Sequence, residues 1–299
     1  MLLPKISIVT PSLNQGQFLE ETILSVINQS YPNLEYIIMD GGSTDGSRNI
    51  IKKYESQITY WDSIKDNGQA NAINNGFKQC TGDIITFCNS DDTYLDGTLH
   101  HIGKKWNEWK SLGALVGAFQ YMNYKSEFIE KPRKPQMKKN GPIDLTIRDP
   151  GDYRLHQVST FFTKHALDKV GRYVDDKLHY VFDRELLYRV VKQYQIYLDK
   201  RVLGAFRLHD ESKSVSKILS FSDEFAYLYR SKKNGNKRDN LQRDLNAKYH
   251  LYRGRIKYAK NCPTTLGKIK SLLIVIWIKP SLFWKRGYWA YWKKFIFKL

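Results

Sequence analysis

The chain has 299 residues, of which 41% are hydrophobic, enough for one large domain or for one domain with an appendage. Its net charge of +18 is unevenly distributed, because no Asp or Glu follows Asp244 whereas 13 Lys and Arg do. The part of the chain up to Asp244 therefore carries only about +5, which does not indicate a nucleic-acid-binding domain. The three cysteines have no metal-like spacing, which favours a cytoplasmic protein without a disulfide framework. The N-terminus does not resemble a signal peptide, and no apolar run is long enough to predict a membrane-spanning helix.

Strands and helices alternate through the first third of the chain. Short runs rich in Ile, Val, Phe and Tyr predict strands, and one-sided apolar patterns predict helices. The predicted strands are residues 5–10, 34–39, 58–61 and 83–88, and the predicted helices are residues 18–29, a segment around Ile50 capped by Ser43, Thr44 or Asp45, and residues 69–80. Because the strands begin about 25 residues apart, we expect an α/β fold with a single open, mainly parallel sheet flanked by helices.

Polar residues follow each predicted strand. Thr10 and Pro11 end the first strand, Asp40 the second and Asp66 the third, and Asp91 and Asp92 follow the fourth. Parallel sheets bind ligands outside the carboxyl ends of their strands, so we expect one polar site at that edge.

Asp91 and Asp92 are adjacent carboxylates, which repel each other unless they share a cation. Mg²⁺ and Mn²⁺ favour such oxygen ligands and are often held by substrate phosphates as well. The alternative is that residues 89–92 simply form a turn whose side chains bond the local backbone. The sequence contains neither G-x-G-x-x-G nor G-x-x-x-x-G-K-[ST], which argues against a dinucleotide or P-loop site and favours a diphosphate held by a metal ion.

Three stretches resemble successive motifs of the family 2 glycosyltransferases: SIVTPSLNQGQFLEETILSVINQSYPNLEYIIMDGGSTDGS, DNGQANAINNG and GDIITFCNSDD. The resemblance extends over residues 5–215 and implies a catalytic domain in residues 1–215 with the GT-A fold, whose nucleotide-binding half is Rossmann-like. It implies inverting transfer of a sugar from a nucleotide-sugar donor, foremost a UDP-sugar, with Mg²⁺ or Mn²⁺. It also implies a saccharide or lipid-linked acceptor in the biosynthesis of a surface polysaccharide or glycolipid.

The resemblance assigns roles to the polar residues of these motifs. Those expected to bind the donor are Thr10, Pro11, Asp40, Asp66, Gln69, Asn74, Ser90 and Asp91. Ser90 stands where a D-x-D motif would begin, so Asp92 is expected to be the direct metal ligand. Asp91 is expected to point at the sugar or ribose and is a second candidate ligand. As a loop acid, Asp92 is expected to be exposed and to contribute little to stability.

The middle of the chain is expected to be less regular. Trp106, Trp109 and the Pro-punctuated residues 127–139 predict loops. Residues 153–162 run from a polar loop into a strand, and the resemblance implies that this segment approaches the acceptor. His156 and Gln157 are therefore candidates to contact the donor sugar or the acceptor, the alternative being that they are ordinary loop residues.

Residues 181–191 predict a helix whose apolar residues share one face. Asp183 lies in its first turn, where the helix dipole favours an acid, so a capping role is the simplest interpretation. The resemblance instead implies that Asp183 is the catalytic base. The alternatives are Arg184 and Glu185, which point at other angles on the helix, and Asp149 and Asp152 in the preceding loop.

Residues 203–214 are expected to follow a further strand and resemble the R-x-H-x-x-x-x-S segment that closes the family's domain, through Arg207, His209 and Ser214. Arg207 is a candidate for contact with the donor sugar or the acceptor. His209 could complete the metal or diphosphate site, because imidazole is an acceptable ligand for ions such as Mn²⁺, although a lone His is more often structural.

Residues 216–299 predict a basic, aromatic-rich helical extension, with helices at residues 221–230 and 241–258. The last stretch interleaves Trp284, Trp289 and Trp292 with Lys and Arg, a composition typical of helices at a membrane surface. We therefore expect peripheral attachment to the anionic inner face of the cell membrane and no nucleic-acid partner. The alternatives are packing on the catalytic domain, a homodimer contact, or base stacking with nucleic acid.

For the whole chain, the alternative to an enzyme is a basic binding protein for lipid or nucleic acid on a degenerate transferase domain.

Overall fold

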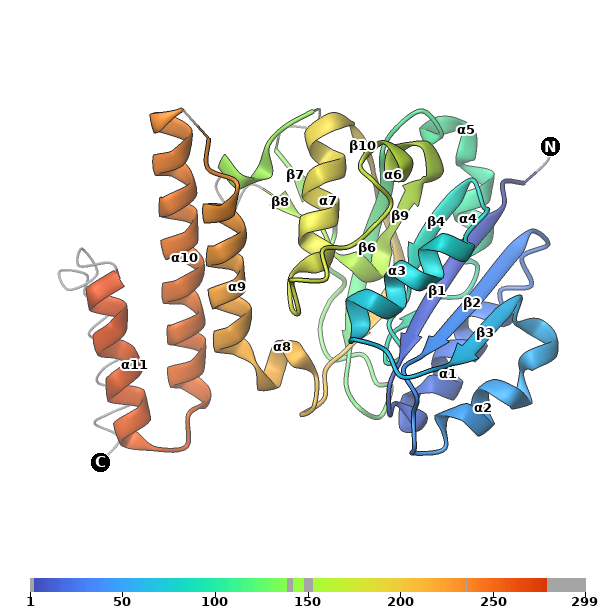
Figure 1. Cartoon of the computed structure of the whole chain (residues 1–299), viewed down its shortest axis with the longest axis horizontal. Coiled ribbons are helices and arrows are strands. Elements are labelled where there is room, and N and C mark those ends of the chain that lie inside the picture. Colours follow the sequence, from blue (N-terminus) through green and yellow to red (C-terminus); the bar gives the residue numbers. More distant parts are fainter. Residues whose placement is uncertain (1–2, 139–141, 148–152, 235, 279–299) are drawn as a thin grey trace. The chain divides into compact units, whose positions relative to one another are not determined.

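A computed structural model of the chain describes residues 3–138, 142–147, 153–234 and 236–278 (Figure 1). The chain divides into two compact units, Met1–Leu145 with Gly151–His209, and Thr146–Pro150 with Asp210–Leu299. The expected boundary of the catalytic domain after residue 215 remains a prediction.

A mixed sheet forms the centre of the first unit. Within the described residues its strands, in spatial order, are β3 (Tyr60–Ser63), β2 (Leu34–Asp40), β1 (Ile6–Ser12), β4 (Ile84–Phe87), β9 (Thr160–Thr163), β6 (Ala114–Met122), β10 (Ile196–Arg207) and β5 (Thr93–Tyr94). β1 to β4 are parallel, β6 is parallel to β10, β9 is antiparallel to both β4 and β6, and β5 is antiparallel to β10. The predicted mainly parallel α/β sheet is therefore confirmed. The carboxyl ends of β1 to β4, β6 and β10 meet at one edge.

Helices cover both faces of this sheet (Figure 1). They are α1 (Gly16–Ile27), α2 (Ser47–Lys53), α3 (Gln69–Gln79), α4 (Thr98–Lys104), α5 (Trp106–Trp109), α6 (Lys164–Lys169) and α7 (Phe182–Gln193). The chain moves outward from β1 to β3 and then returns to β4, so right-handed crossovers place α1 and α2 on one face and α3 on the other. α3 lies directly on β1, because a Cβ at Gly76 would be only 2.3 Å from Cγ1 of Val9.

Two predictions about local structure are wrong. The segment Trp106–Trp109 is helix α5 rather than a loop, and Trp109 is fully buried with its ring centroid 4.9 Å from that of Trp106. Burying such large apolar side chains fixes a segment that its sequence alone leaves ambiguous. The residues from Leu203 to Arg207 do not follow a strand but form the end of β10, paired with β6 as far as Arg207 opposite Met122.

Short elements complete the first unit. β7 (Gln136–Met137) and β8 (Tyr153–Arg154) pair in a separate antiparallel ladder. The predicted capping of α2 is displaced: Gly46, with φ of 95°, precedes the helix, and Oδ1 of Asp45 accepts from the N–H of Ser47 at 3.1 Å. The αL conformation of Gly46 lets the chain enter the helix from this direction.

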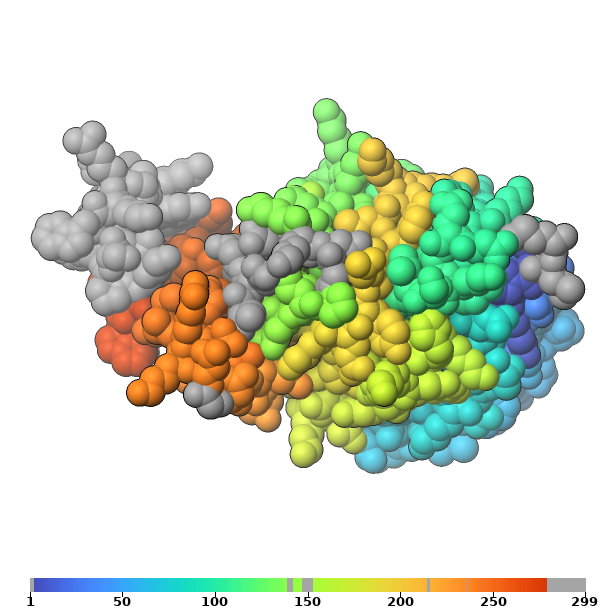
Figure 2. Space-filling model, turned by 90° about the horizontal axis from the view of Figure 1, so that it is seen from above, coloured from blue at the N-terminus to red at the C-terminus, as the bar shows by residue number. Residues whose placement is uncertain are grey.

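The second unit is helical. It contains α8 (Lys213–Ser216), α9 (Ile218–Ser231), α10 (Lys237–Asn261) and α11 (Thr265–Ile278), with α10 packed on both α9 and α11 (Figure 1). Figure 2 shows part of the surface of this unit in orange and red. Both predicted helices in this region are confirmed. The ring of His250 on α10 stacks on that of Phe225 on α9, with centroids 4.3 Å apart. None of the helices in the described ranges combines the length and apolarity needed to cross a bilayer. Trp284, Trp289 and Trp292 lie outside the described residues.

Candidate active site at the carboxyl edge of the sheet

The ends of β1 and β2 provide the first polar groups of the edge. Thr10 is fully buried, with its Oγ1 3.1 Å from Oη of Tyr36, and Pro11 is buried beside it. Oγ of Ser12 and Oε1 of Gln15 are buried and have no hydrogen-bond partner in the part of the chain that the structure describes. Buried polar atoms normally have partners, so these two indicate a place for a polar ligand. Nothing in the sequence singled out Gln15.

Asp40 and Asp66 approach each other at the end of β2. Asp40 is buried, and its carboxylate accepts from the N–H of Ser43 at 2.9 Å and from Oγ of Ser63 at 2.6 Å. Asp66 accepts from the N–H of Gly68 at 2.7 Å, and a Cβ at Gly41 would lie 3.0 Å from its carboxylate. The predicted donor-binding acids are thus neighbours, and Asp40 also shapes the loop that follows β2.

Asp62 joins this acidic group and was not predicted. Burial raises the pKa of Asp62, and the negative charges of Asp40 and Asp66 raise it further. A hydrogen bond from Tyr60 lowers this pKa, but the net shift is upward. Its position in β3, opposite Met39 of β2, could have suggested this proximity once the strand order was known.

The two predicted donor residues of α3 have different surroundings. Nε2 of Gln69 donates to Oδ1 of Asn89 at 2.8 Å, so Gln69 contacts the acidic turn after β4. Asn74 is instead bonded to the backbone of Val174 through both ends of its amide, at 2.9 and 2.8 Å. The geometry therefore favours a structural role for Asn74 over donor binding.

The expectation that Asp92 is an exposed loop acid is wrong. Asp92 is fully buried, its Oδ1 accepts from the backbone N–H of Arg207 at 3.0 Å, and its Oδ2 accepts from Nδ2 of Asn89 at 3.1 Å. Burial, followed by the charge of Asp91, raises the pKa of Asp92 against these two hydrogen bonds. Ser90, which the resemblance assigns to the donor, is also buried. Asp92 therefore holds the turn together from inside.

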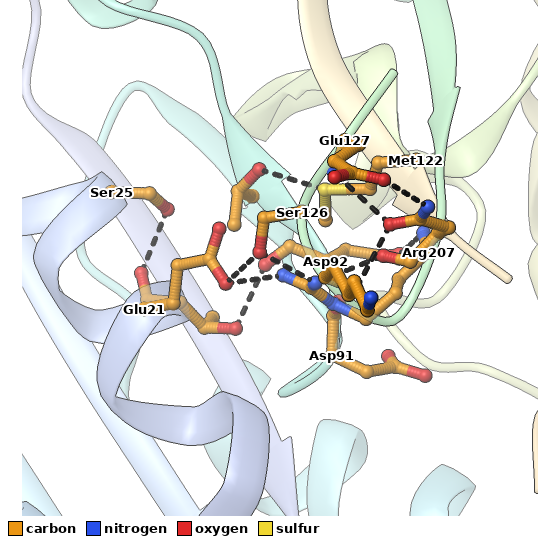
Figure 3. Close-up of polar contacts among 12 residues, drawn as sticks. Glu21, Ser25, Asp91, Asp92, Met122, Ser126, Glu127 and Arg207 are labelled. Atoms are coloured by element: carbon orange, nitrogen blue, oxygen red, sulfur yellow. Dashed lines mark hydrogen bonds and ion pairs between the residues drawn. The ribbon is translucent and has the colours of Figure 1, made fainter. Parts of the chain in front are cut away.

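The side chain of Asp91, rather than that of Asp92, is partly exposed to solvent. This side chain is 23% exposed, and its Oδ2 lies 3.1 Å from Nε2 of His209. Figure 3 shows its carboxylate pointing away from the contacts of the buried Arg207. The ring of His209 lies 4.8 Å from that of Phe18 on α1, which supports the imidazole from the other side.

Asp91 and His209 fit a divalent cation. Two atoms at adjacent positions of an octahedral ion, each about 2.1 Å from it, lie about 3.0 Å apart. The Oδ2–Nε2 separation of 3.1 Å is close to this value, and it is also the length of the hydrogen bond that these two atoms share. No cluster of three or more His, Cys, Asp or Glu suited to a metal occurs in the described ranges, so further ligands would have to come from a bound phosphate or water.

The geometry of Arg207 favours a structural role over the predicted contact with the donor sugar or the acceptor. Its side chain is 0% exposed, and its Nε donates to the carbonyl of Asp91 at 2.8 Å. The candidate role came from the resemblance to the R-x-H-x-x-x-x-S segment, which does not show that the guanidinium is buried.

His156 and Gln157 also point into the interior. The ring of His156 stacks on Phe119 with centroids 4.1 Å apart, and its Nδ1 is buried without a partner among the described residues. Burial, and to a lesser degree the charge of Arg184, lowers the pKa of His156 to about 3. Gln157 is buried and donates to the carbonyl of Phe87. The geometry favours the structural alternative for His156.

Asp183 lies in the first turn of α7, as predicted, and lines a small pocket. The pocket walls are Phe87, Gln157, Thr160, Phe162, Asp183, Arg184 and Leu187. Phe87 is the last residue of β4, so the pocket begins at the strand that leads into the acidic turn. The side chain of Asp183 is 22% exposed.

The neighbours of Asp183 on α7 are less suited to act as a base. Glu185 has a 4% exposed side chain that pairs with Nε of Arg189 at 2.7 Å. Arg184 donates to the carbonyl of Leu155. Asp149 and Asp152 lie outside the described residues.

Comparison with known proteins defines the class of the chain. Residues 7–171, more than half of it, match the sequence model described as Glycosyl transferase family 2. The chain therefore belongs to the family 2 glycosyltransferases.

Individual relatives agree with this assignment. A GalNAc(5)-diNAcBac-PP-undecaprenol beta-1,3-glucosyltransferase of Campylobacter jejuni is 33% identical over 111 residues, which cover 36% of this chain and 36% of that protein. The crystal structure of S. aureus TarS 1-349 in complex with UDP-GlcNAc has a TM-score of 0.60 at 15% identity and covers 92% of this chain and 81% of the other. The mannosyltransferase PcManGT from Pyrobaculum calidifontis, in complex with GDP-Man and Mn²⁺, has a TM-score of 0.61 at 14% identity and covers 99% and 86%. These two structures show that the GT-A type of fold is shared.

Proposed function

We propose that the chain transfers a sugar from a nucleotide-sugar donor to an acceptor hydroxyl with inversion at the anomeric carbon. The observation that carries this proposal is the separation of two kinds of group at one edge of the sheet. Asp91 and His209 pair with each other there, while Asp183 presents a second, partly exposed carboxylate beside β4.

Asp183 is the group that takes the acceptor proton. The acceptor oxygen forms a bond to the anomeric carbon while the bond from that carbon to the diphosphate breaks, so the nucleoside diphosphate leaves with the electron pair. A base within hydrogen-bond reach of the hydroxyl accelerates this step, and the first turn of α7 holds the Asp183 carboxylate in a fixed place. A single displacement of this kind needs no nucleophile from the enzyme.

Asp91 and His209 would hold Mg²⁺ or Mn²⁺, which when bound neutralises the charge that develops on the leaving diphosphate. PcManGT is seen with Mn²⁺ and a nucleotide sugar on the same type of fold, which supports this assignment. Asp40, Asp62 and Asp66 would accept from the N–H and O–H groups of the nucleoside. A UDP-sugar and a GDP-sugar both occur among the structural neighbours.

The acceptor is a saccharide or a lipid-linked saccharide in the synthesis of a surface polysaccharide or glycolipid. The undecaprenol-linked acceptor named for the Campylobacter relative supports the lipid-linked form. The second unit supports attachment to the anionic inner face of the cell membrane, because α11 exposes Leu266, Leu273 and Trp277 beside Lys268 and Lys270.

A donor screen tests the proposal. The full chain is incubated with UDP- and GDP-sugars, with Mn²⁺, Mg²⁺ or EDTA, and release of nucleoside diphosphate is measured. We expect release from one donor class, dependent on the metal. If no donor is hydrolysed or transferred while liposomes or nucleic acid are bound tightly, the chain is a binding protein on a transferase scaffold.

A further inference from the structure

Arg207 has no direct part in the proposed chemistry, yet it is a fully enclosed cation at this edge of the first unit. Its side chain is 0% exposed, and its guanidinium carbon lies 4.7 Å from the centroid of the Phe18 ring. A buried charge is unfavourable unless it is paired and hydrogen-bonded, so the contacts of Arg207 indicate what it holds in place.

One set of contacts fixes the acidic turn (Figure 3). The backbone N–H of Arg207 donates to Oδ1 of Asp92 at 3.0 Å, and its Nε donates to the carbonyl of Asp91 at 2.8 Å. From α1, Oγ1 of Thr22 donates to the carbonyl of Asp92 at 2.8 Å. The backbone that directly follows the Asp91 side chain is thereby fixed.

The other set of contacts fixes the guanidinium itself. Nη2 pairs with Oε2 of Glu21 at 2.6 Å, and Nη1 donates to Oγ of Ser126 at 2.9 Å and to the carbonyl of Asn123 at 3.2 Å. Oγ of Ser126 in turn donates to Oε2 of Glu21 at 2.7 Å, which closes a triangle of three side chains. Ser126 has φ of 65°, an uncommon conformation for a residue other than glycine, so this loop is held by its contacts.

Arg207 therefore joins α1 and the loop after β6 to the turn that carries Asp91. His209 lies only two residues after Arg207 in the chain, so the contacts of Arg207 also restrict the position of the His209 imidazole. We infer that Arg207 is a positioning residue, which keeps the Asp91 carboxylate and the His209 imidazole at the separation that a divalent cation requires. Glu21 and Ser126 hold its guanidinium. This inference rests on the proposed function, since it takes Asp91 and His209 as the ligands.

The test measures Mn²⁺ binding directly. Arg207→Lys keeps the positive charge, but a single ammonium cannot make the bonds of Nε, Nη1 and Nη2 together. Loss of a group that orients a ligand typically weakens metal affinity by about 10- to 100-fold, and we expect a rise of that size in the Kd of Mn²⁺. The Kd is measured by electron paramagnetic resonance with UDP or GDP present. Excess Mn²⁺ should restore the rate of transfer.

Two further variants make the result specific. Glu21→Gln removes the negative charge that pairs with Nη2 and that also accepts from Oγ of Ser126, at a side chain that is 44% exposed. It remains informative where Arg207→Lys fails to fold. It should weaken Mn²⁺ binding several-fold with an unchanged unfolding midpoint. The control is Arg201→Lys on the same strand, whose exposed side chain donates to the carbonyl of Asp96 at 3.2 Å. It should leave Mn²⁺ binding unchanged.

The possible outcomes distinguish a failure of the role inferred for Arg207 from a failure of the proposed metal site. If folded Arg207→Lys and Glu21→Gln bind Mn²⁺ within about twofold of the unaltered chain, far less than the expected change, Arg207 serves the fold only and the inference is overturned. The same holds if stability falls without any change in Mn²⁺ affinity. If the unaltered chain binds no Mn²⁺ with either nucleotide, the proposed metal site fails and this inference with it.

Discussion

At the scale of single residues, two adjacent acids of the same turn have opposite environments. Asp92 is enclosed and accepts hydrogen bonds through both oxygens, whereas Asp91 has a 23% exposed side chain whose Oδ2 lies 3.1 Å from Nε2 of His209. Because Asp92 is fully buried, a cation from solvent reaches the carboxylate of Asp91 more readily than that of Asp92. We therefore propose Asp91, the first acid of the pair, rather than Asp92 as the metal contact.

Substitution of these acids should separate metal binding from stability. Asp91→Asn should raise the Mn²⁺ concentration for half-maximal donor turnover at least tenfold and change the free energy of unfolding by less than about 0.5 kcal/mol. Asp92→Ala should lower the free energy of unfolding by about 1–3 kcal/mol, because it leaves the N–H of Arg207 and the amide of Asn89 without their partner. Mn²⁺ titrations and urea unfolding of both variants give the two quantities. A stable Asp92→Ala that has lost its response to Mn²⁺ would restore the original assignment.

Asp183→Asn should remove the base without disturbing donor binding. The amide keeps the size of the side chain but cannot take the acceptor proton, so transfer should fall by roughly 10²–10⁴. Donor affinity should persist, because the proposed donor contacts lie at Asp40, Asp66 and Asp91. Transfer rates and calorimetry of donor binding are compared with those of Asp176→Asn, an exposed acid in the preceding loop. A loss of affinity with a normal rate per bound donor would make Asp183 a binding or structural residue.

At the scale of the elements, the opposite end of the sheet carries a network that fastens β1 and β2 to the start of β4. Glu35 of β2 is buried and accepts from Oγ of Ser7 at 2.5 Å, from the N–H of Thr81 at 2.7 Å and from Nζ of Lys5 at 2.8 Å. Burial alone would raise the pKa of Glu35, but the hydrogen bonds from Lys5, Ser7 and Thr81 hold it at about 2. Its ordinary value is 4.5.

This network should make stability depend on pH in a definite direction. Because the pKa of Glu35 is lower in the folded state, its contribution is complete above pH 4.5 and is lost as the pH falls towards 2. The difference in free energy of unfolding between the unaltered chain and Glu35→Gln should shrink by an amount on the order of 3 kcal/mol between those limits. Urea unfolding at a series of pH values measures it, with the exposed Glu55→Gln as the control. A difference that does not vary with pH would show that Glu35 is not ionised in this network.

At the scale of the whole molecule, the chain joins a catalytic unit to a basic helical unit. α11 buries Leu272 and Val275 within its own unit, while Leu266, Leu273 and Trp277 are 72%, 53% and 84% exposed. These three residues are spaced by seven and four positions and so share one helix face. The thirteen cations beyond Asp244 have no acid among them, which suits this face to an anionic lipid surface.

Removing the apolar face should release the protein from membranes. Leu273→Ser with Trp277→Ser, or deletion of residues 279–299, should reduce sedimentation with anionic liposomes and leave hydrolysis of a soluble donor measurable. Deletion from residue 268 would also remove the buried Leu272 and Val275, so the smaller changes are the cleaner test. Binding should weaken with salt, because charge attraction is screened over about 8 Å at physiological ionic strength. Tyr227→Ser, at a 56% exposed site on α9, is the control. Unchanged sedimentation of both altered forms would contradict a membrane role.

The sequence by itself determined those structural features that depend on residues close together in the chain. The spacing of apolar residues predicted the alternation of strands and helices, and with it the sheet edge at which Asp40, Asp66 and Asp91 lie. The start of α7, and so the place of Asp183 in its first turn, was likewise readable from a local pattern. These features follow from periodicity, which a short stretch of sequence carries in full.

Only the tertiary structure decided which side chain of each group faces outward. The burial of Asp92 and Arg207 depends on a contact between residues 115 positions apart, and the bonds of Asn74 on a loop 100 positions away. The antiparallel insertion of β9 between β4 and β6 and the burial of Trp109 depend in the same way on distant segments. A charged or aromatic side chain looks the same in the sequence whether it faces solvent or the interior, because its surroundings are supplied by residues far along the chain.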